Sequence, residues 1–305
     1  MLQKWAVFAR ERFPLGSHLV MVAAFTVGNL KLAQHFSPSE SLISTKETLF
    51  QADFFLLALL ALLFFFRLRL FDEIKDYEVD LKVNPTRPLA RGLISVKEAK
   101  NAVGCVLTLE LVVCFLLNGI YGVFFHLPAI AYSFLMYREF FIGNFLRTRL
   151  TTYAVLHTYV SVLLGFSLSL HWLGRSGLSL PLQNFLFLFV NWGFFNLFEF
   201  ARKTFSSQEE RPNVESYSKV FSLPGAVVLS WTQVVLPLFL LFQLGLFQKQ
   251  PFGGGVLAAI AFVLTIATGI YFVLKRSTSS AKLFRFGVSL YLILGYLGLS
   301  VVSTL

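Results

Sequence analysis

Long apolar runs alternate with short polar connections along this chain. Each run is about 20 residues long, the length that an α-helix needs to cross the hydrocarbon core of a bilayer. The runs predict nine spans, at residues 15–34, 51–71, 98–117, 119–137, 152–172, 183–202, 221–243, 254–274 and 284–304. Glu11 and Arg12 precede the first run and no small-residue cleavage site follows it, so we interpret it as a span and not as a signal peptide. The pattern predicts an all-α integral membrane protein with one domain over residues 1–305.

Composition and charge agree with this class. The chain is 56% hydrophobic and has a net charge of +10, with a mean hydropathy of +0.70. Of its 26 Lys and Arg residues, only Lys31, Lys46, Arg175 and Lys249 fall on the second side of the predicted spans. The positive-inside rule then predicts a cytoplasmic N-terminus and an external C-terminus, as in a bacterial inner membrane. Cations that flank spans and face anionic lipid account for the net charge, so neither a nucleic-acid partner nor a protein partner is inferred.

An acidic run directly follows the second apolar segment. It holds three of the four aspartates, Asp72, Asp76 and Asp80, together with Glu73. At about 100° per residue on a helix, the aspartates step by about 40° each, so the four carboxylates share one face over about 12 Å. Such a concentration of like charge at a membrane edge is costly unless a cation neutralises it, and hard oxygen ligands suit Mg²⁺. The alternative is a solvated, charged helix end.

The continuation of this run resembles a known signature. The sequence DEIKDYEVD is followed by NPTRPLARGLIS, and the pair is similar to the first motif of the UbiA family of intramembrane prenyltransferases, whose usual acidic form is NDxxDxxxD. Asp72 stands in the place of the Asn, and Glu73 in the place of the first Asp. The remaining matches are Asp76, Asp80, Arg87, Pro88, Leu89 and Gly92.

A second cluster lies at the end of the sixth predicted span. It resembles the family's second motif, RExxKDxxDxxxD, at Glu199, Arg202 and Glu210, and departs from it at Lys203 and Ser206. An ammonium group has three donors and no acceptor, so Lys203 cannot bind Mg²⁺. We expect it to contact diphosphate directly as a point charge. The alternative for Arg202 and Lys203 is a pair of ordinary helix-end cations.

The resemblance implies a fold and a reaction. It implies nine transmembrane helices around a central cavity that opens at the cytoplasmic side, and Mg²⁺-assisted transfer of a prenyl group from a (poly)prenyl diphosphate to an aromatic or quinone-precursor acceptor. The implied metal ligands are Asp72, Glu73, Asp76, Asp80, Glu199 and Glu210. The implied diphosphate-binding residues are Arg87, Arg138 and Arg202, where Arg138 follows a Tyr132-Ser133 pair typical of the family. From its charge we add Lys203 to this group, and we expect Asp76, Asp80 and Lys203 to be the catalytic residues.

Other polar residues inside the spans leave a second class of function open. A transporter with an intramembrane cation site would account for Glu110 and Glu199. It would not account for the acidic run beside an RPL loop, and the chain has no inverted repeat of broken helices. His157 either touches an acceptor or bonds to a neighbour. We expect Asn29 and Gln233 to make interhelical hydrogen bonds.

Overall fold

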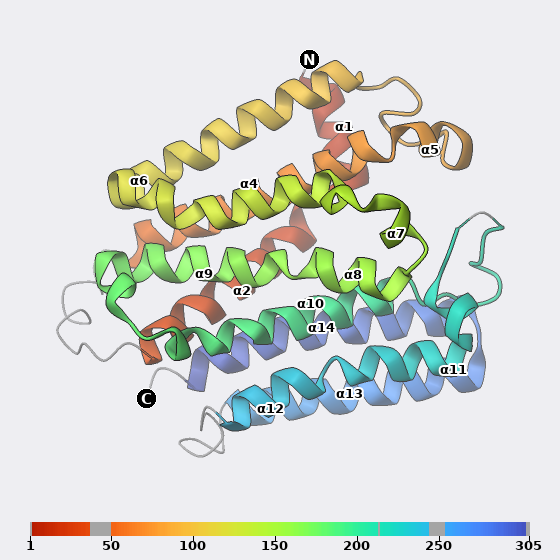
Figure 1. Cartoon of the computed structure of the whole chain (residues 1–305). Helices are drawn as coiled ribbons and strands as arrows, with labels where there is room; N and C mark the ends of the chain where they lie inside the picture. Colours follow the sequence, from red (N-terminus) through yellow and green to blue (C-terminus); the bar gives the residue numbers. More distant parts are fainter. Residues whose placement is uncertain (1, 37–49, 213, 244–253, 303–305) are drawn as a thin grey trace.

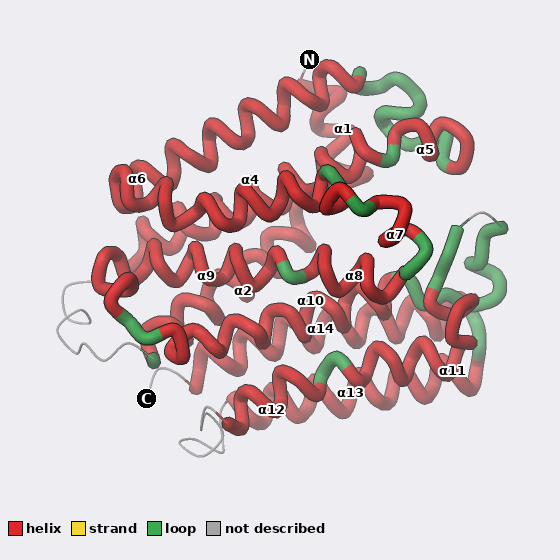
Figure 2. Tube along the Cα trace, viewed as in Figure 1, coloured by secondary structure: helices red, strands yellow, loops and turns green. Residues whose placement is uncertain are grey.

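The computed structural model describes residues 2–36, 50–212, 214–243 and 254–302, and within these ranges it contains helices and no strand (Figures 1 and 2). The α-helices are α1 (Leu2–Arg12), α2 (Leu15–His35), α4 (Phe50–Lys75), α5 (Tyr77–Val83), α6 (Val96–Tyr137), α7 (Gly143–Arg147), α8 (Leu150–Thr158), α9 (Val160–Leu173), α10 (Phe189–Arg202), α11 (Tyr217–Thr232), α12 (Val235–Gln243), α13 (Gly254–Lys275) and α14 (Thr278–Val302). Short 3₁₀ segments are η2 (Glu139–Phe141), η3 (Gly174–Ser179) and η4 (Leu182–Leu188).

Within the described residues, seven helical segments are long and apolar enough to cross a membrane, which supports an integral membrane protein. The predicted all-α class is confirmed, whereas the count of nine spans stays a prediction. Two of the predicted spans lie in the single element α6, and the apolar part of α13, Ala259–Lys275, is shorter than the other spans. The polar connection predicted at residues 35–50 lies largely outside the described residues.

The α6 helix is a hairpin of two arms. Asn118 (φ −141°, ψ 22°) and Gly119 (φ 59°, ψ −144°) leave helical geometry, and the chain reverses there (Figure 1). Gly119 adopts a left-handed φ that favours glycine. Gly122 packs so closely that a Cβ would lie 2.0 Å from the carbonyl oxygen of Cys114. The predicted boundary between residues 117 and 119 coincides with this turn.

Two inner helices, α2 and α10, are joined by buried polar side chains. Asn191 of α10 donates from Nδ2 to Oδ1 of Asn29 on α2 at 2.8 Å, and Tyr296 of α14 donates to Oδ1 of Asn191 at 2.8 Å. Gly165 of α9 lies beside this pair, since a Cβ there would come within 2.6 Å of both asparagine side chains. The prediction of an interhelical hydrogen bond at Asn29 is confirmed, and together with the Tyr296 bond it joins α2, α10 and α14. The same prediction for Gln233 is wrong, because its amide donates to Leu229 O and Thr232 Oγ1 in its own segment.

A buried ion pair holds the α6 hairpin against α4. The Arg67 guanidinium donates to both carboxylate oxygens of Glu110, at 2.7 and 2.9 Å, and to Ser133 Oγ at 2.6 Å. His126 lies 3.3 Å from Glu110 through Nε2, and its Nδ1 contacts Ser167 Oγ of α9. All five side chains are buried. This cluster connects both arms of α6 to α4 and α9, so Glu110 has a packing partner and is not an isolated charge.

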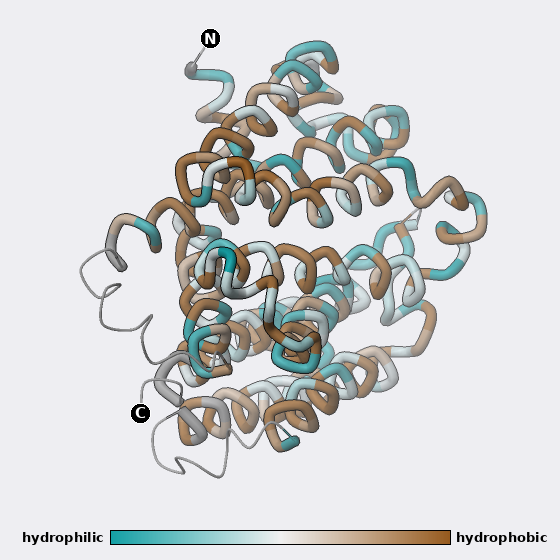
Figure 3. The backbone as a smooth tube through the Cα atoms, turned by 60° about the vertical axis from the view of Figure 1, so that its left-hand side comes forward, coloured by the Kyte–Doolittle hydropathy of each residue, from teal (hydrophilic) through white to brown (hydrophobic). Residues whose placement is uncertain are grey.

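Hydrophilic positions gather near helix ends and in the connections between helices, and the long helices are largely hydrophobic between their ends (Figure 3). The helices α5 and α7 and the segment 203–212 all lie at one end of the bundle, on the right in Figure 1. The N-terminal helix α1 is attached at this end through an ion pair of Glu11 with Arg91, at 2.9 Å. Both acidic clusters singled out from the sequence are therefore brought to the same end.

Candidate active site at one end of the helix bundle

The acidic run spans the junction of α4 and α5. The helix α4 ends at Lys75, and Asp76 (φ −87°, ψ 0°) precedes α5. The helical hydrogen-bond pattern continues across the junction, with Asp76 N donating to Asp72 O at 2.9 Å and Asp80 N donating to Asp76 O at 2.8 Å. The three aspartates therefore remain one turn apart, as the sequence predicts, although their side chains meet different partners.

Two of the four carboxylates form structural ion pairs. Glu73 is buried and accepts a hydrogen bond from Arg12 of α1. Its second oxygen, Oε2, is buried without a hydrogen-bond partner among the described residues. Asp80 is buried and accepts from Arg87 Nη1 at 2.6 and 2.8 Å and from Asn84 Nδ2 at 2.9 Å. These contacts anchor α1 and the loop after α5, and they occupy Arg87 as well as Asp80.

Asp72 and Asp76 make no close ion pair among the described residues. The Asp72 side chain is 51% exposed, and its nearest cations are Arg69 at 3.8 Å and Lys75 at 3.9 Å. Asp76 is half-buried. Burial raises the pKa of the Asp76 carboxyl, and the charges of Asp72 and Asp80 add to this effect against Lys75 and Arg87. Burial therefore disfavours the charged form of this carboxyl, and a bound cation would favour it.

The donor set fits one hard cation. Within the described residues there is no preformed group of three or more His, Cys, Asp or Glu side chains able to hold a metal. Mg²⁺ is commonly bound through one or two carboxylates and completes its shell with water and substrate phosphate. Asp72 and Asp76 supply two such carboxylates. Glu73, next to Asp72 in the sequence, has a further carboxylate oxygen, Oε2, without a hydrogen-bond partner among the described residues.

The end of α10 carries an excess of positive charge. Glu199 accepts two hydrogen bonds from Arg202 Nη2, at 2.6 and 2.9 Å, and lies 3.1 Å from Lys203 Nζ. Glu210 lies on the segment after α10, where it accepts from Ser216 at 2.6 Å and Ser218 at 2.7 Å. Two cations thus face one carboxylate at Glu199. The predicted ligands Glu199 and Glu210 thus have separate partners, and among the described residues they share no group of three or more metal-binding side chains.

Arg138 makes no ion pair with this cluster among the described residues. It is the exposed C-cap of α6, and it makes none of the ion pairs found among the described residues. The three residues after it, Glu139, Phe140 and Phe141, all have positive φ, at 49°, 54° and 59°. Left-handed non-glycine residues cost of order 1–3 kcal/mol each and are over-represented at functional sites. Here Arg147 holds the buried Glu139 at 2.9 Å.

Comparison with solved structures shows which fold this is. The chain superimposes on a UbiA homolog from Aeropyrum pernix K1 with a TM-score of 0.60 and 17% identity, over 92% of this chain and 97% of that chain. It also matches a structure described as a digeranylgeranylglyceryl phosphate synthase in membranes, with a TM-score of 0.57 and 18% identity, over 95% and 98% of the two chains. This chain has a UbiA-like fold. No protein-family model and no curated protein matches the sequence.

Within this UbiA-like fold, two side chains that the sequence analysis did not assign lie beside the candidate site. Lys75 Nζ donates to the hydroxyl of Tyr153 at 2.7 Å, which connects α4 to α8. The acidic run and the α10 cluster also approach each other, since Asp72 lies within electrostatic range of Arg202. Lys75 lies within the acidic run, so its position in the sequence could have indicated it. Tyr153 lies in an otherwise apolar segment, and only its contact with Lys75 reveals it.

Proposed function

We propose that this protein transfers a prenyl group from a prenyl diphosphate to an aromatic or quinone-precursor acceptor within the membrane. The observation that carries the proposal is the pairing of opposite charges at one end of a UbiA-like bundle. Asp72 and Asp76 present carboxylates from the α4–α5 junction, and Arg202 and Lys203 present cations from α10. A divalent cation on the first pair and a diphosphate between the two pairs would satisfy both sets of charges.

The charges suit the breaking of an allylic C–O bond. Bound by Asp72 and Asp76, Mg²⁺ would neutralise negative charge that builds up on the leaving diphosphate. Arg202 and Lys203 would donate hydrogen bonds to the same oxygens. The allylic cation that remains needs aromatic faces and exclusion of water. We place substrate entry at the end of the bundle that carries α5 and α7, which the sequence predicts to be cytoplasmic.

We propose distinct roles for the remaining predicted residues. Glu73 and Asp80 orient Arg12 and Arg87, and Glu199 orients Arg202 and Lys203. Arg87 would reach the diphosphate only by leaving Asp80. The competing transporter is not favoured, because the two carboxylates on which it depends, Glu110 and Glu199, are each paired with a cation.

Pyrophosphate release tests the proposed function directly. Purified protein in lipid vesicles should release pyrophosphate from a prenyl diphosphate only when Mg²⁺ is present, and a prenylated product should appear in the lipid extract by mass spectrometry. A panel of prenyl chain lengths, supplied with a lipid extract of the source cells as the acceptor pool, identifies both substrates. Ion-dependent uptake into the vesicles without pyrophosphate release would instead support the transporter.

A Lys203 variant tests whether this lysine contacts the diphosphate in place of a second metal ion. Lys203→Ala should raise the KM for prenyl diphosphate and lower kcat, with a combined loss of ~2–4 kcal/mol if the contact strengthens in the transition state. Rates measured against Mg²⁺ concentration should fit one required ion in the wild type.

The matched control is Lys282→Ala, an exposed lysine near the start of α14, which should leave the kinetics unchanged. Cooperative dependence on two metal ions in the wild type would contradict the role proposed for Lys203. Unchanged kinetics in Lys203→Ala would leave Lys203 as a helix-end cation.

We also propose that the end carrying α5 faces the cytoplasm of a bacterial inner membrane, with the N-terminus on the same side. In a background that lacks Cys105 and Cys114, Thr86→Cys should resist impermeant thiol reagents added to intact cells and react after permeabilisation. Ser179→Cys, an exposed position in the connection predicted to face outward, should react in intact cells. The reverse labelling pattern would overturn the orientation. The charge argument also uses Lys46 and Lys249, which lie outside the described residues.

A further inference from the structure

His157 lies at the centre of a group of aromatic rings beside the candidate active site. Its imidazole stacks on Tyr153 with the ring centroids 3.9 Å apart, and it meets Phe140 edge-on at 5.7 Å. From Phe140, ring contacts continue through Tyr132 to Tyr159 at 5.3 and 5.5 Å. The arrangement holds the plane of the imidazole in one orientation.

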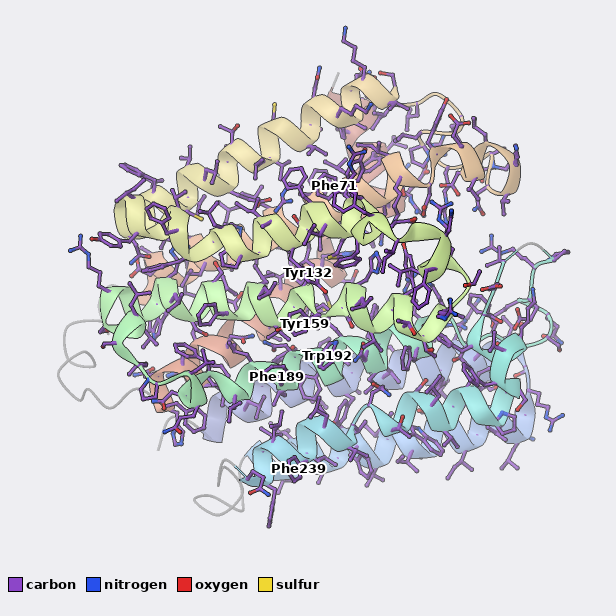
Figure 4. All side chains as sticks on the ribbon, in the orientation of Figure 1. Phe71, Tyr132, Tyr159, Phe189, Trp192 and Phe239 are labelled. Atoms are coloured by element: carbon purple, nitrogen blue, oxygen red, sulfur yellow. The ribbon has the colours of Figure 1, made fainter. Side chains whose placement is uncertain are left out.

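The same rings extend toward the middle of the bundle. Tyr159 contacts Trp192 at 5.6 Å and Phe189 at 6.3 Å. Tyr132, Tyr159, Trp192 and Phe189 follow one another between the second arm of α6, the α8–α9 junction and α10 (Figure 4). All four are partly buried. We call these four residues the aromatic stripe, and its Tyr132 end is connected to His157 through Phe140.

The hydrogen bonding of His157 determines which nitrogen carries the proton. Nδ1 lies 2.7 Å from the carbonyl oxygen of Tyr153, which can only accept, so Nδ1 is the donor. In the neutral ring Nε2 then has the lone pair. Nε2 is buried and has no hydrogen-bond partner among the described residues. In its neutral form His157 is therefore a base whose basic nitrogen, Nε2, has no hydrogen-bond partner among the described residues.

The surroundings of His157 separate it from a second histidine with similar bonding. The charged groups in electrostatic range of His157 are Lys75 and Asp72 of α4 and Glu199 of α10, which all belong to the candidate active site. His171 also has a buried, unpartnered Nε2, and its Nδ1 lies 2.6 Å from Asn118. That histidine lies beside the hairpin turn of α6, at the opposite end of the bundle (Figure 1).

We propose that Nε2 of His157 accepts the proton that the acceptor loses during prenyl transfer, and that the acceptor lies between His157 and the aromatic stripe. The inference rests on the proposed function. It assigns an acceptor that attacks through a group bearing a hydrogen, such as a phenolic O–H or an aromatic C–H, because such an acceptor must give up a proton once the new bond forms.

The step balances without any further reactant. The C–O bond between the prenyl group and diphosphate breaks, and both electrons leave with the diphosphate. The acceptor oxygen or ring carbon forms the new bond to the allylic carbon, and its proton moves to Nε2 of His157. Proton transfer to diphosphate or water returns the imidazole to its neutral form. Tyr153 acts as a positioning residue, because its carbonyl holds Nδ1 and its hydroxyl is bound by Lys75.

His157→Gln tests the proposal, since the glutamine amide can still donate to the Tyr153 carbonyl but cannot accept the proton as a base. With radiolabelled farnesyl diphosphate and the lipid extract as acceptor pool, kcat should fall by ~10²–10⁴-fold. Equilibrium binding of farnesyl diphosphate in the presence of Mn²⁺ should stay within about threefold of the wild type. The wild-type rate should decline as pH falls through the range in which imidazole is protonated, and this limb should vanish in the variant.

The controls separate the possible failures. His171→Gln should keep the wild-type rate per folded protein, and added imidazole should partly restore His157→Ala. A His157→Gln rate within about threefold of wild type, or a loss of farnesyl diphosphate binding together with the rate, would overturn the proposal while leaving the proposed function intact. A wild type that transfers no label would overturn the proposed function, and the inference with it.

Discussion

Asp76→Asn should nearly abolish prenyl transfer while the helix bundle stays folded. Asp76 is half-buried beside Asp72, and removal of its charge removes half of the carboxylate pair that fits Mg²⁺. Metal stabilisation of a leaving group is worth several kcal/mol, so a loss of about 4 kcal/mol, or roughly 10³-fold in rate, is expected. Turnover at saturating prenyl diphosphate and limiting Mg²⁺ gives the measurement, and Mn²⁺ binding followed by electron paramagnetic resonance should weaken in parallel.

The control for this variant is Asp53→Asn, at the other end of the same helix. It carries the same change of charge, far from the candidate site, and should keep the wild-type rate and Mn²⁺ affinity. Wild-type turnover by Asp76→Asn at limiting Mg²⁺ would exclude Asp76 as a metal ligand.

Arg67→Met should be the most destabilising single substitution considered. Arg67 is fully buried and bonds both oxygens of Glu110 as well as Ser133. Removal of one partner of a buried pair leaves the other charge uncompensated, at a cost of about 3–5 kcal/mol. A lower yield of folded protein and a lower thermal midpoint in detergent, followed by tryptophan fluorescence, should report the loss.

Two further variants distinguish loss of the Arg67–Glu110 ion pair from a general effect of removing an arginine from α4. Arg69→Met, two residues along α4, removes a partly exposed arginine and should change the thermal midpoint much less. Arg67→Met combined with Glu110→Met should recover part of the stability, because the uncompensated charge is gone. A double variant less stable than Arg67→Met alone would show that the stabilisation comes from other contacts of Glu110.

Periodicity and length predict most helices of this protein correctly. The first span, predicted at 15–34, is observed as α2, Leu15–His35, and the break predicted at residue 118 is the hairpin of α6. These features depend on local properties, namely the length of an apolar run and the conformational freedom of Gly119. The division of the fifth span at Tyr159 into α8 and α9 and the N-terminal helix α1 were not predicted. The N-terminal helix packs on distant segments, since Phe8 lies in a buried cluster with Leu70 and Ile94.

The candidate site is predicted only in part. Its position and residue types follow from the acidic run and the end of α10. The spacing of Asp72, Asp76 and Asp80 along one helical face is correct for the backbone. The spacing does not tell which carboxylates remain available, because this depends on Arg12 and Arg87, which lie elsewhere in the sequence.

The sequence by itself determined the class of protein and the end at which charge gathers, because hydrophobic length and helical spacing are local properties that survive any arrangement of the helices. The tertiary structure decided how the charges are distributed. It paired Glu73 and Asp80 with arginines, left Asp72 and Asp76 available, and brought Lys75 to Tyr153. It also placed near these charges a nitrogen of His157 that has no hydrogen-bond partner in the part of the chain that the structure describes. Burial and partner identity depend on contacts between segments that are distant along the chain, and no local pattern encodes them.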